Sequence, residues 1–414
     1  MRVIADLHIH SRFSRSCSKD LTLPNIAKMC ERKGIGLVAT ADFTHPAWRK
    51  DIGEELEEIG KGVLKLKGDR SATRFVLSTE VSCIYKRGGK ARRVHHVILF
   101  SSLAAVDHFN KTLIDRGFNV KSDGRPILGL DSVDLLKFVM EADEQGMLIP
   151  AHAWTPWFAI FGSQSGFDSL EECFGDLASN IYAIETGLSS DPAMNWRLSA
   201  LDRIFLVSNS DAHSLEKLGR EANVFEMEVP SYDELRRILV EHDTSKFIET
   251  LEFFPEEGKY HVDGHRVCDF WCEPDETKRR KGICPKCGKP LTVGVLHRVS
   301  DLADRAKGEK PAQTVPFRSV IPLAEIVADV LEVGTGSKAV QKEVDRLLAD
   351  GRTEFGVLLD ETEASLMKIT EPEIAQAILR VRAGQVDIRP GYDGKFGKIS
   401  INNSLKKKEQ GSLF

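Results

Sequence analysis

Val3-Ile4-Ala5-Asp6-Leu7-His8-Ile9-His10, at the start of the chain, is the stretch that decides the fold. Its residues alternate as they do in a β-strand, so His8 and His10 project from the same face. A second apolar run, Ile204 to Ser210, leads into Asp211-Ala212-His213 about 200 residues later. A sheet or barrel that brings both strand ends to one rim gathers imidazoles and carboxylates there. The two runs together predict a site for several metal ions.

Length and composition are those of a soluble protein with more than one structural unit. The 414 residues are too many for one compact core, and 42% hydrophobic and 29% charged residues are ordinary values. No apolar run reaches the length of a membrane span, and the N-terminus lacks a signal-peptide pattern. We therefore expect a cytoplasmic protein. A net charge of −5 means that any contact with a nucleic acid requires local basic patches.

Strand-like and helix-like patterns alternate from Met1 to about Phe254. The expected strands are Val3–His10, Leu37–Thr40, Phe75–Val81, Val94–Phe100, Leu148–Ala151, Tyr182–Glu185 and Ile204–Ser208. Helical stretches such as Pro24–Lys33 and Val133–Gln145 lie between several of them. This alternation predicts an α/β fold with a mostly parallel sheet and a ligand site at the C-terminal strand ends. About seven repeats favour a barrel over an open sheet.

Polar residues that could act chemically fall at these strand ends. They are His8, His10, Asp42, Glu80, His152, Glu185 and Asp211. A single histidine is more often structural than a ligand, but coincidence at so many strand ends is implausible. Imidazoles and carboxylates together suit Zn, Mn or Fe better than Ca or Mg. Two or three such ions would bind a phosphate and activate a water molecule. The pattern therefore predicts hydrolysis of a phosphate ester.

Four of the eight cysteines form a second cluster, Cys268-x3-Cys272 and Cys284-x2-Cys287. This spacing is typical of structural zinc, and four thiolates leave no open position for catalysis. We therefore expect a zinc ribbon. Between its halves lies the basic run Lys278-Arg279-Arg280-Lys281, which is either a solvated face or a contact for a nucleic-acid backbone.

The remainder of the chain reads as a small, mostly helical domain. The expected helices are Ala324–Leu331, Lys338–Asp350 and Glu373–Arg382, with short strands at Glu354–Leu359 and Ile399–Ile401. The chain is therefore divided into four parts. These are a barrel at 1–255, a ribbon at 256–300, a helical domain at 301–398 and a basic tail at 399–414.

Six ordered motifs in residues 1 to about 255 resemble those of the polymerase and histidinol phosphatase (PHP) superfamily. They are Asp6-Leu7-His8-Ile9-His10-Ser11, Ala41-Asp42-x-x-His45, Thr79-Glu80, Val94-His95-His96-Val97, Pro150-Ala151-His152 and Asn209-Ser210-Asp211-Ala212-His213. The resemblance implies a distorted (β/α)7 barrel with a centre of two or three divalent ions. Zn or Mn is expected there, with Mg as an alternative, besides the one structural Zn.

The same resemblance implies which residues bind these ions. They are His8, His10, Asp42, His45, Glu80, His95, His96, His152, Asp211 and His213, with His95 and His96 as alternatives. Glu80 would bridge two ions, and Asp211, Glu80 and His152 would act in catalysis. We prefer His96, because the run Val97-Ile98-Leu99 after it matches the family's strand better. Many members carry a further ligand where Ser16 stands, so one ion has fewer ligands here or is held differently.

The order of barrel, four-cysteine ribbon and helical region with Pro390-Gly391-Tyr392-Asp393-Gly394 resembles the endonuclease Q family over essentially the whole length. This implies a DNA-repair nuclease that cuts 5′ to a deaminated base (hypoxanthine, uracil or xanthine) or an abasic site, with residues 301–398 as a DNA-binding domain. The alternatives are a PHP phosphatase acting on a small phosphomonoester and a DNA-binding module on a barrel that has lost its activity. The barrel alone would suffice for the phosphatase, so the added segments favour the nuclease.

Several residues are candidates for contact with DNA. Donors to a flipped base could come from Asn119, Ser189 and Asn209, and stacking could come from Trp154 and Trp157. Core packing is an equal alternative for the aromatic residues. Phosphates could meet Lys278, Arg279 and Arg280 of the ribbon and the basic stretches Lys86 to Arg93 and Arg116 to Arg125.

The last five residues, Gln410-Gly411-Ser412-Leu413-Phe414, resemble a bacterial sliding-clamp-binding peptide, in which Gln410, Leu413 and Phe414 would dock. Such short motifs also arise by chance, but this one follows a basic run at the C-terminus. We therefore expect a monomer, associated with the nucleoid, whose partners are damaged DNA and a sliding clamp.

Overall fold

The computed structural model describes residues 1–60, 62–68 and 71–401. Internal contacts divide the chain into two compact units. The first comprises Met1–Glu31, Ile35–Thr250 and Arg298–Phe317, and the second comprises Arg32–Gly34, Leu251–His297 and the described residues from Arg318 onward. The division into four parts that the sequence suggests is finer than this, and it stays a prediction.

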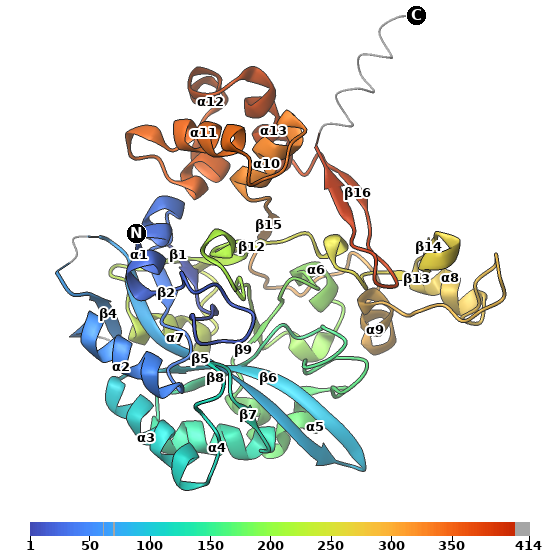
Figure 1. Cartoon of the computed structure of the whole chain (residues 1–414). Helices are drawn as coiled ribbons and strands as arrows, with labels where there is room; N and C mark the ends of the chain where they lie inside the picture. The colour runs from blue at the N-terminus through green and yellow to red at the C-terminus, as the bar shows by residue number, and fades with distance from the viewer. Residues whose placement is uncertain (61, 69–70, 402–414) are drawn as a thin grey trace, which may run out of the picture. The chain divides into compact units, whose positions relative to one another are not determined.

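A ring of seven strands, counted over the described residues, forms the centre of the first unit (Figure 1). They are β1 (Arg2–Asp6), β2 (Leu37–Ala39), β5 (Arg74–Arg87), β6 (Lys90–Phe100), β8 (Met147–Pro150), β9 (Ala183–Glu185) and β10 (Phe205–Val207). Ala153 N donates to Glu185 O between β8 and β9, and Asp211 N donates to His8 O where β10 returns to β1. All seven strands expected from the sequence are present, and the predicted distorted barrel is confirmed.

The pairing of β5 with β6 departs from the mostly parallel sheet that we expected. The two strands are antiparallel from Leu77↔Phe100 to Arg87↔Lys90. Only Gly88 and Gly89 separate them, with φ of 59° and 75°, as a tight two-residue hairpin turn requires. No helix can fit into so short a connection, so the direction of β6 is reversed.

Further elements surround this ring in the first unit. The strands are β3 (Leu56–Gly60), β4 (Val63–Leu66), β7 (Ile127–Leu128) and β11 (Ala222–Glu226), while β12 (Phe247–Glu252) and β15 (Phe317–Ser319) span the boundary between the two units. The helices are α1 (Leu23–Lys33), α2 (Pro46–Glu55), α3 (Leu103–Asp115), α4 (Ser132–Ala142), α5 (Leu170–Phe174), α6 (Pro192–Asn195) and α7 (Tyr232–Val240). Buried apolar side chains of β1, β6, β8, β10 and α7 belong to one cluster. The barrel interior is therefore packed, and polar side chains collect at the strand ends.

The second unit contains the ribbon and the helical region. The ribbon has the antiparallel pair β13 (Asp263–His265) and β14 (Phe270–Cys272), followed by α8 (Pro274–Arg279) and the start of α9 (Val295–Leu302). Figure 1 shows α10 (Leu323–Leu331), α11 (Lys338–Leu347), α12 (Glu363–Ile369) and α13 (Pro372–Arg382) packed together. The hairpin of β16 (Asp387–Arg389) and β17 (Lys398–Ser400) follows them.

The expected helices and the last strand of this unit are confirmed, but the strand expected at Glu354–Leu359 is wrong. Residues Gly356–Asp360 form a helical turn in which Val357, Leu358 and Leu359 are buried. A short apolar run has no periodicity that separates a buried strand from a buried helical turn. Among the described helices, none has both the length and the apolar character needed to cross a membrane.

Candidate metal centre

Four side chains from β5 and from the ends of β1 and β10 converge at one place in the barrel. The ligand atoms of His8, His10, Glu80 and Asp211 all lie within 4.8 Å of one another. His10 Nε2 is 3.0 Å from Asp211 Oδ1 and 3.3 Å from Glu80 Oε2. His8 Nε2 and His10 Nε2 are buried and make no hydrogen bond. Buried polar atoms almost always have a partner, so this set of nitrogen and oxygen donors fits a bound cation.

A second group shares Glu80 with the first and adds His95 and His152. Glu80 Oε1 lies 2.7 Å from His95 Nδ1 and 3.2 Å from His152 Nε2, whereas Oε2 faces His8 and His10. One carboxylate therefore presents one oxygen to each group. This is the arrangement that the predicted bridging role of Glu80 requires.

The charges of the centre oppose the effect of burial. Burial alone raises the pKa of Glu80, but His95, Arg125 and His8 hold this pKa well below its usual value. Burial alone lowers the pKa of His8, but the charges of Glu185 and Glu80 raise it well above its usual value. A raised pKa of His8 means that a proton and a cation compete for this side chain.

Two buried carboxylates orient the histidines from behind. Glu185 Oε1 is 3.0 Å from His8 Nδ1, and Glu185 Oε2 accepts a hydrogen bond from His152 N at 2.8 Å. Asp42 accepts bonds from Ser11 N and Ser11 Oγ and lies 3.3 Å from His10 Nδ1. Asp42 was expected among the ligands, but it belongs to neither group. The sequence pattern indicates Glu185 only as a residue at a strand end. Its contact with His8 is a tertiary contact, which that pattern does not predict.

The choice between His95 and His96 follows from the register of β5 and β6. Directly paired residues share a face of the sheet, and His96 pairs with Val81, whose side chain points away from that of Glu80. His96 Nε2 accordingly lies 2.9 Å from Ser132 Oγ, and His95 faces Glu80 instead. Our preference for His96 as the ligand is therefore corrected to His95.

His45 and His213 also lie outside both groups. The ring of His45 stacks on Phe13 with centroids 4.4 Å apart. The ring of His213 is 4.6 Å from that of His10, and its Nδ1 is 2.8 Å from the carbonyl oxygen of Asp211. His213 therefore lies beside the centre, whereas His45 packs against Phe13.

One arginine reaches the centre. Arg125 Nη1 donates to Glu80 Oε2 at 3.0 Å. Its loop is fixed by Thr44 Oγ1, which donates to Gly124 O at 3.2 Å, and by Ser82 N, which donates to Pro126 O at 3.0 Å. The sequence predicts only that the basic stretch from Arg116 to Arg125 could contact phosphates. In the fold, Arg125 is the residue of this stretch that contacts Glu80.

Two of the residues proposed to contact DNA form hydrogen bonds inside the barrel unit instead. Asn209 Oδ1 accepts from Leu7 N at 2.8 Å, and its Nδ2 donates to Glu185 at 2.9 Å. Trp154 is buried and donates from Nε1 to Asn195 at 2.7 Å. Asn209 as a base reader and Trp154 as a stacking platform are therefore corrected to structural residues, because neither side chain is accessible.

The other candidates in the barrel have different surroundings. Trp157 is 45% exposed, and Asn119 is exposed with its Oδ1 accepting from Lys121 N. Ser189 is half-buried in the loop after β9. These three stay predictions.

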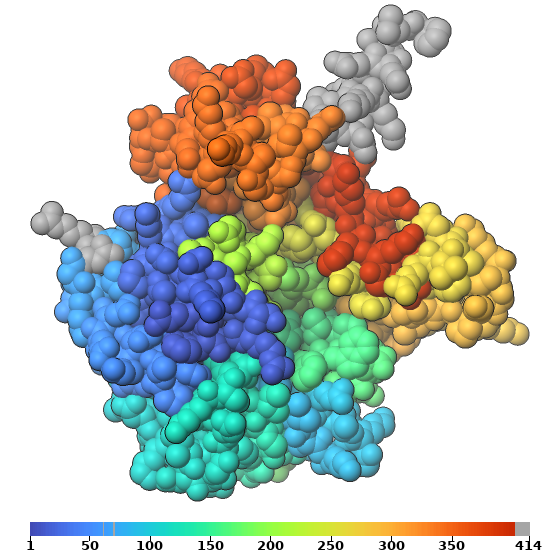
Figure 2. Space-filling view, in the orientation of Figure 1, coloured from blue at the N-terminus to red at the C-terminus, as the bar shows by residue number. Residues whose placement is uncertain are grey.

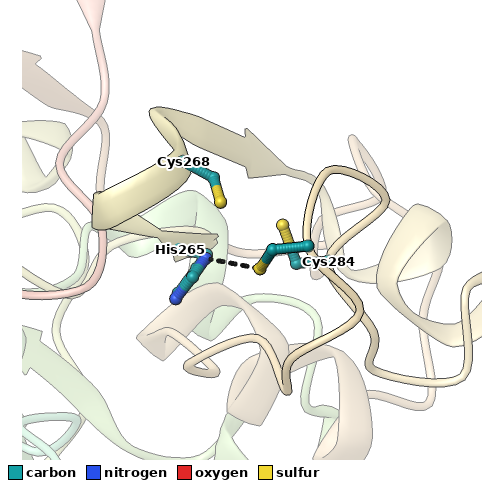
Figure 3. Close-up of side chains that lie close together, drawn as sticks. His265, Cys268 and Cys284 are labelled. Atoms are coloured by element: carbon teal, nitrogen blue, oxygen red, sulfur yellow. Dashed lines mark hydrogen bonds between the residues drawn. The ribbon is translucent and has the colours of Figure 1, made fainter.

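The ribbon brings together His265, Cys268, Cys284 and Cys287, whose ligand atoms lie within 4.8 Å of one another (Figure 3). Burial would raise the pKa of the Cys284 thiol, but hydrogen bonds from Lys286 N, Cys287 N and His265 lower it to about 7. A thiol with a lowered pKa deprotonates more readily, as a metal ligand must.

Cys272, expected as the fourth ligand, lies outside this group. It pairs with Asp263, whereas His265 pairs with Phe270, so Cys272 sits about 7 Å further along the strands. Its sulfur contacts Thr277 Oγ1 at 3.2 Å. The four cysteines still fit the expected zinc ribbon, because Cys272 packs against Cys284, and His265 is a further candidate ligand. Which four of these residues bind the zinc stays a prediction.

The basic run of the ribbon is part of α8 and the turn after it. Arg279 and Arg280 both pair with Glu276, at 2.7 and 2.6 Å, while Lys278 is exposed. These pairs are typical of a solvated helix face. The proposed clamp-binding residues Gln410, Leu413 and Phe414 lie outside the described residues.

Comparison with known proteins finds relatives over the whole length. Residues 322–385 match the family model of the MJ0043 C-terminal domain. The Bacillus subtilis protein YqxK is 29% identical over 96% of this chain and 99% of its own. The Methanocaldococcus jannaschii protein MJ0043 is 32% identical over 60% of this chain, which covers only 31% of MJ0043.

Two solved structures match more completely. The crystal structure of PfuEndoQ, a lesion-specific endonuclease from Pyrococcus furiosus, has a TM-score of 0.87 and 34% identity over 100% of both chains. Endonuclease Q in complex with a 27-mer duplex substrate, with an abasic lesion at the active site, has a TM-score of 0.84 and 34% identity over 98% of both chains. With this identity over full length, and with its barrel, ribbon and helical region in the same order, the chain belongs to the endonuclease Q family.

Proposed function

We propose that this protein is a DNA-repair endonuclease that hydrolyses the phosphodiester bond 5′ to a deaminated base or an abasic site. The observation that carries the proposal is the 34% identity, over the full length of both chains, to a lesion-specific endonuclease. The two metal-binding groups that share Glu80 supply the chemistry that such a reaction needs. Duplex DNA with a lesion is accordingly the proposed substrate, and the cytoplasmic nucleoid is the proposed place of action.

The residues present fit two or three divalent ions, with Zn or Mn favoured and Mg as an alternative. His8, His10 and Asp211 would hold one side of the centre, His95 and His152 would hold the other, and Glu80 would bridge them. When bound, these ions supply Lewis acidity to the phosphate and lower the pKa of a bound water molecule. Glu185 keeps His8 oriented and Asp42 keeps His10 oriented during the reaction.

Arg125 is the proposed phosphate contact among the protein's own side chains. Its guanidinium group is held at Glu80 Oε2, at the edge of the centre. A planar guanidinium binds two oxygens of a phosphate side by side, which a lysine cannot do. Arg125 would therefore neutralise the charge that develops on the scissile phosphate.

A labelled duplex with one uracil, hypoxanthine or abasic site tests the function directly. We expect a single nick on the 5′ side of the lesion with Mn or Zn present and none in the matched undamaged duplex. Mapping of both new ends locates the cut. If no nick forms while a small phosphomonoester is turned over rapidly, the protein is a PHP phosphatase instead.

The ribbon is proposed to hold one structural Zn through His265, Cys268, Cys284 and Cys287. A site with four protein ligands has no open position, so it would support the fold and not the reaction. The C-terminal residues Gln410 to Phe414 are proposed to bind a sliding clamp. Their deletion should abolish clamp pull-down and leave nicking of a free oligonucleotide unchanged, while retained pull-down would reject that role.

A further inference from the structure

The β16–β17 hairpin exposes a large aromatic side chain. Phe396, in the loop between the two strands, is 72% exposed. The hairpin packs against the ribbon within the second unit (Figure 2). Tyr392 there forms a parallel bridge with Val262. Exposing a phenylalanine ring to water is unfavourable. The contacts that fix the backbone around Phe396 therefore show whether the fold keeps this ring exposed.

The turn before Phe396 is closed by hydrogen bonds and anchored to the ribbon. Tyr392 N donates to Lys395 O at 3.1 Å, and Lys395 N donates to Tyr392 O at 2.8 Å. Tyr392 is buried, and its hydroxyl donates to Asp269 Oδ1 at 2.5 Å. Gly394 N donates to the carbonyl oxygen of Lys259. The turn is therefore held from several sides.

Glycines fix the chain on both sides of this turn. A Cβ atom at Gly391 would clash with the carbonyl oxygen of Gly258, and one at Gly397 would clash with that of Glu256. Gly391 N donates to Glu256 O at 2.7 Å, and Gly397 N donates to Glu257 O at 3.0 Å. The backbone around Phe396 approaches its neighbours as closely as only glycine allows. The exposure of Phe396 is therefore built into the fold.

One lysine lies at the ring, and further cations lie in the same hairpin. Lys259 Nζ lies 4.5 Å from the centroid of the Phe396 ring. The nearby carboxylate of Asp269 already pairs with Lys395 at 2.8 Å and with Arg389 at 3.4 Å. Residues 259–297 and 385–401 together contain 11 Lys or Arg and 7 Asp or Glu, in a chain whose net charge is −5. The hairpin and ribbon are thus locally basic.

An exposed ring on a rigid turn, beside cations, matches the chemistry of an opened nucleic acid. Bases stack on aromatic rings, and the neighbouring phosphates attract lysine and arginine. We propose that Phe396 is a base-stacking residue that contacts the DNA duplex where a base has lost its partner, with Lys259 and Lys395 at the adjacent phosphates. The proposal rests on the proposed function in that it takes lesion-containing DNA as the partner.

The test compares wild type with Phe396→Ala, Phe396→Trp and the control Ile388→Ala, which removes a 45%-exposed side chain from a strand of the same hairpin. The probe is a duplex with 2-aminopurine opposite an abasic-site analogue, with no divalent ion added. We expect Phe396→Ala to weaken binding about 5- to 150-fold and to abolish the change in 2-aminopurine fluorescence. Phe396→Trp should keep both, and Ile388→Ala should behave like wild type.

Melting temperature and metal content show whether Phe396→Ala keeps its fold, and Phe396→Trp tests stacking even if it does not. The proposal is overturned if Phe396→Ala binds and quenches like wild type, if Phe396→Trp loses both signals, or if only the sedimentation coefficient changes, which would indicate self-association. Binding that depends on Phe396 in a protein that nicks no lesion would reject the proposed function and keep this inference. If the wild type nicks lesions but its DNA binding does not depend on Phe396, the proposed function is kept and this inference is rejected.

Discussion

The metal centre of the barrel and the ligand cluster of the ribbon are assembled in opposite ways. The first takes His8, Glu80 and Asp211 from strands far apart in the sequence, and its side chains are mostly buried. The second takes all its ligands from His265 to Cys287, and Cys287 is exposed. A site made by a packed barrel is formed before a metal arrives, whereas a small local site depends on its metal to fold. Loss of one ligand in the barrel should therefore lower the nicking activity, whereas loss of one ligand in the ribbon should lower the stability of the fold.

The largest effect on activity is expected from Asp211→Asn, which removes one candidate ligand from the barrel centre. Asn tolerates the left-handed backbone of this position, where φ is 46°, so the fold should remain. Without the carboxylate, nicking of a lesion duplex should fall roughly 100- to 1,000-fold, because negative charge that holds a cation is lost. Single-turnover nicking and thermal melting are the measurements. If the melting temperature of the whole protein falls instead, the barrel site is not formed before a metal binds, and the two sites do not differ in this respect.

Substitutions in the ribbon should change metal content instead of chemistry. We expect His265→Ala to lose about one zinc per chain and to lower the first melting transition, because the site is left with three ligands. Cys272→Ser should keep the zinc, since Cys272 is not among the four residues whose ligand atoms lie within 4.8 Å of one another and its sulfur contacts Thr277 Oγ1. Elemental analysis of the purified variants decides the point. Zinc loss in Cys272→Ser with full zinc in His265→Ala would restore the four-cysteine set.

A smaller effect is expected from the carboxylate behind the barrel histidines. Glu185→Gln keeps the shape of the side chain but weakens its hold on His8 Nδ1, which lies 3.0 Å away. Affinity for Mn should fall about 10- to 100-fold, as for other groups that orient a metal-binding histidine. Calorimetric titration of the metal-free protein measures this change. Glu226→Gln, on the exposed position of β11, is the control, and equal losses in the two variants would show that Glu185 has no special role.

The smallest effect concerns stability at acidic pH. Burial, followed by the charge of His95, lowers the pKa of His96 from 6.5 to about 3. Between these values only the unfolded chain binds the proton, so stability is present above pH 6.5 and is lost as pH falls toward 3. At pH 5 this histidine should cost about 2 kcal/mol relative to pH 8.

Urea denaturation at both pH values compares wild type with His96→Gln, which should lose that part of the pH dependence. His108→Gln, on an exposed position of α3, should keep it. Unchanged pH dependence in His96→Gln would place the acid sensitivity elsewhere, for instance in the metal centre.

Local patterns predicted the elements better than they predicted contacts. The alternation of residues in β1 and the spacing of strands along the first unit were sufficient for a barrel, because burial imposes a period on each strand. The Gly88-Gly89 turn, also visible in the sequence, would have revealed that β5 and β6 are antiparallel. The helical turn at Gly356–Asp360 could not be separated from a strand by its short apolar run.

The order of the segments, the seven strands of the barrel and the residue types that could bind metals all follow from the amino-acid sequence. Tertiary structure decided which of these residues meet. The pairing of His96 with Val81 turns His96 away and leaves His95 at Glu80, and the fold of the ribbon brings His265 to Cys268, Cys284 and Cys287. The reason is physical: the period of a strand follows from its own residues, whereas the register between two strands is set by the turns and packing that join them.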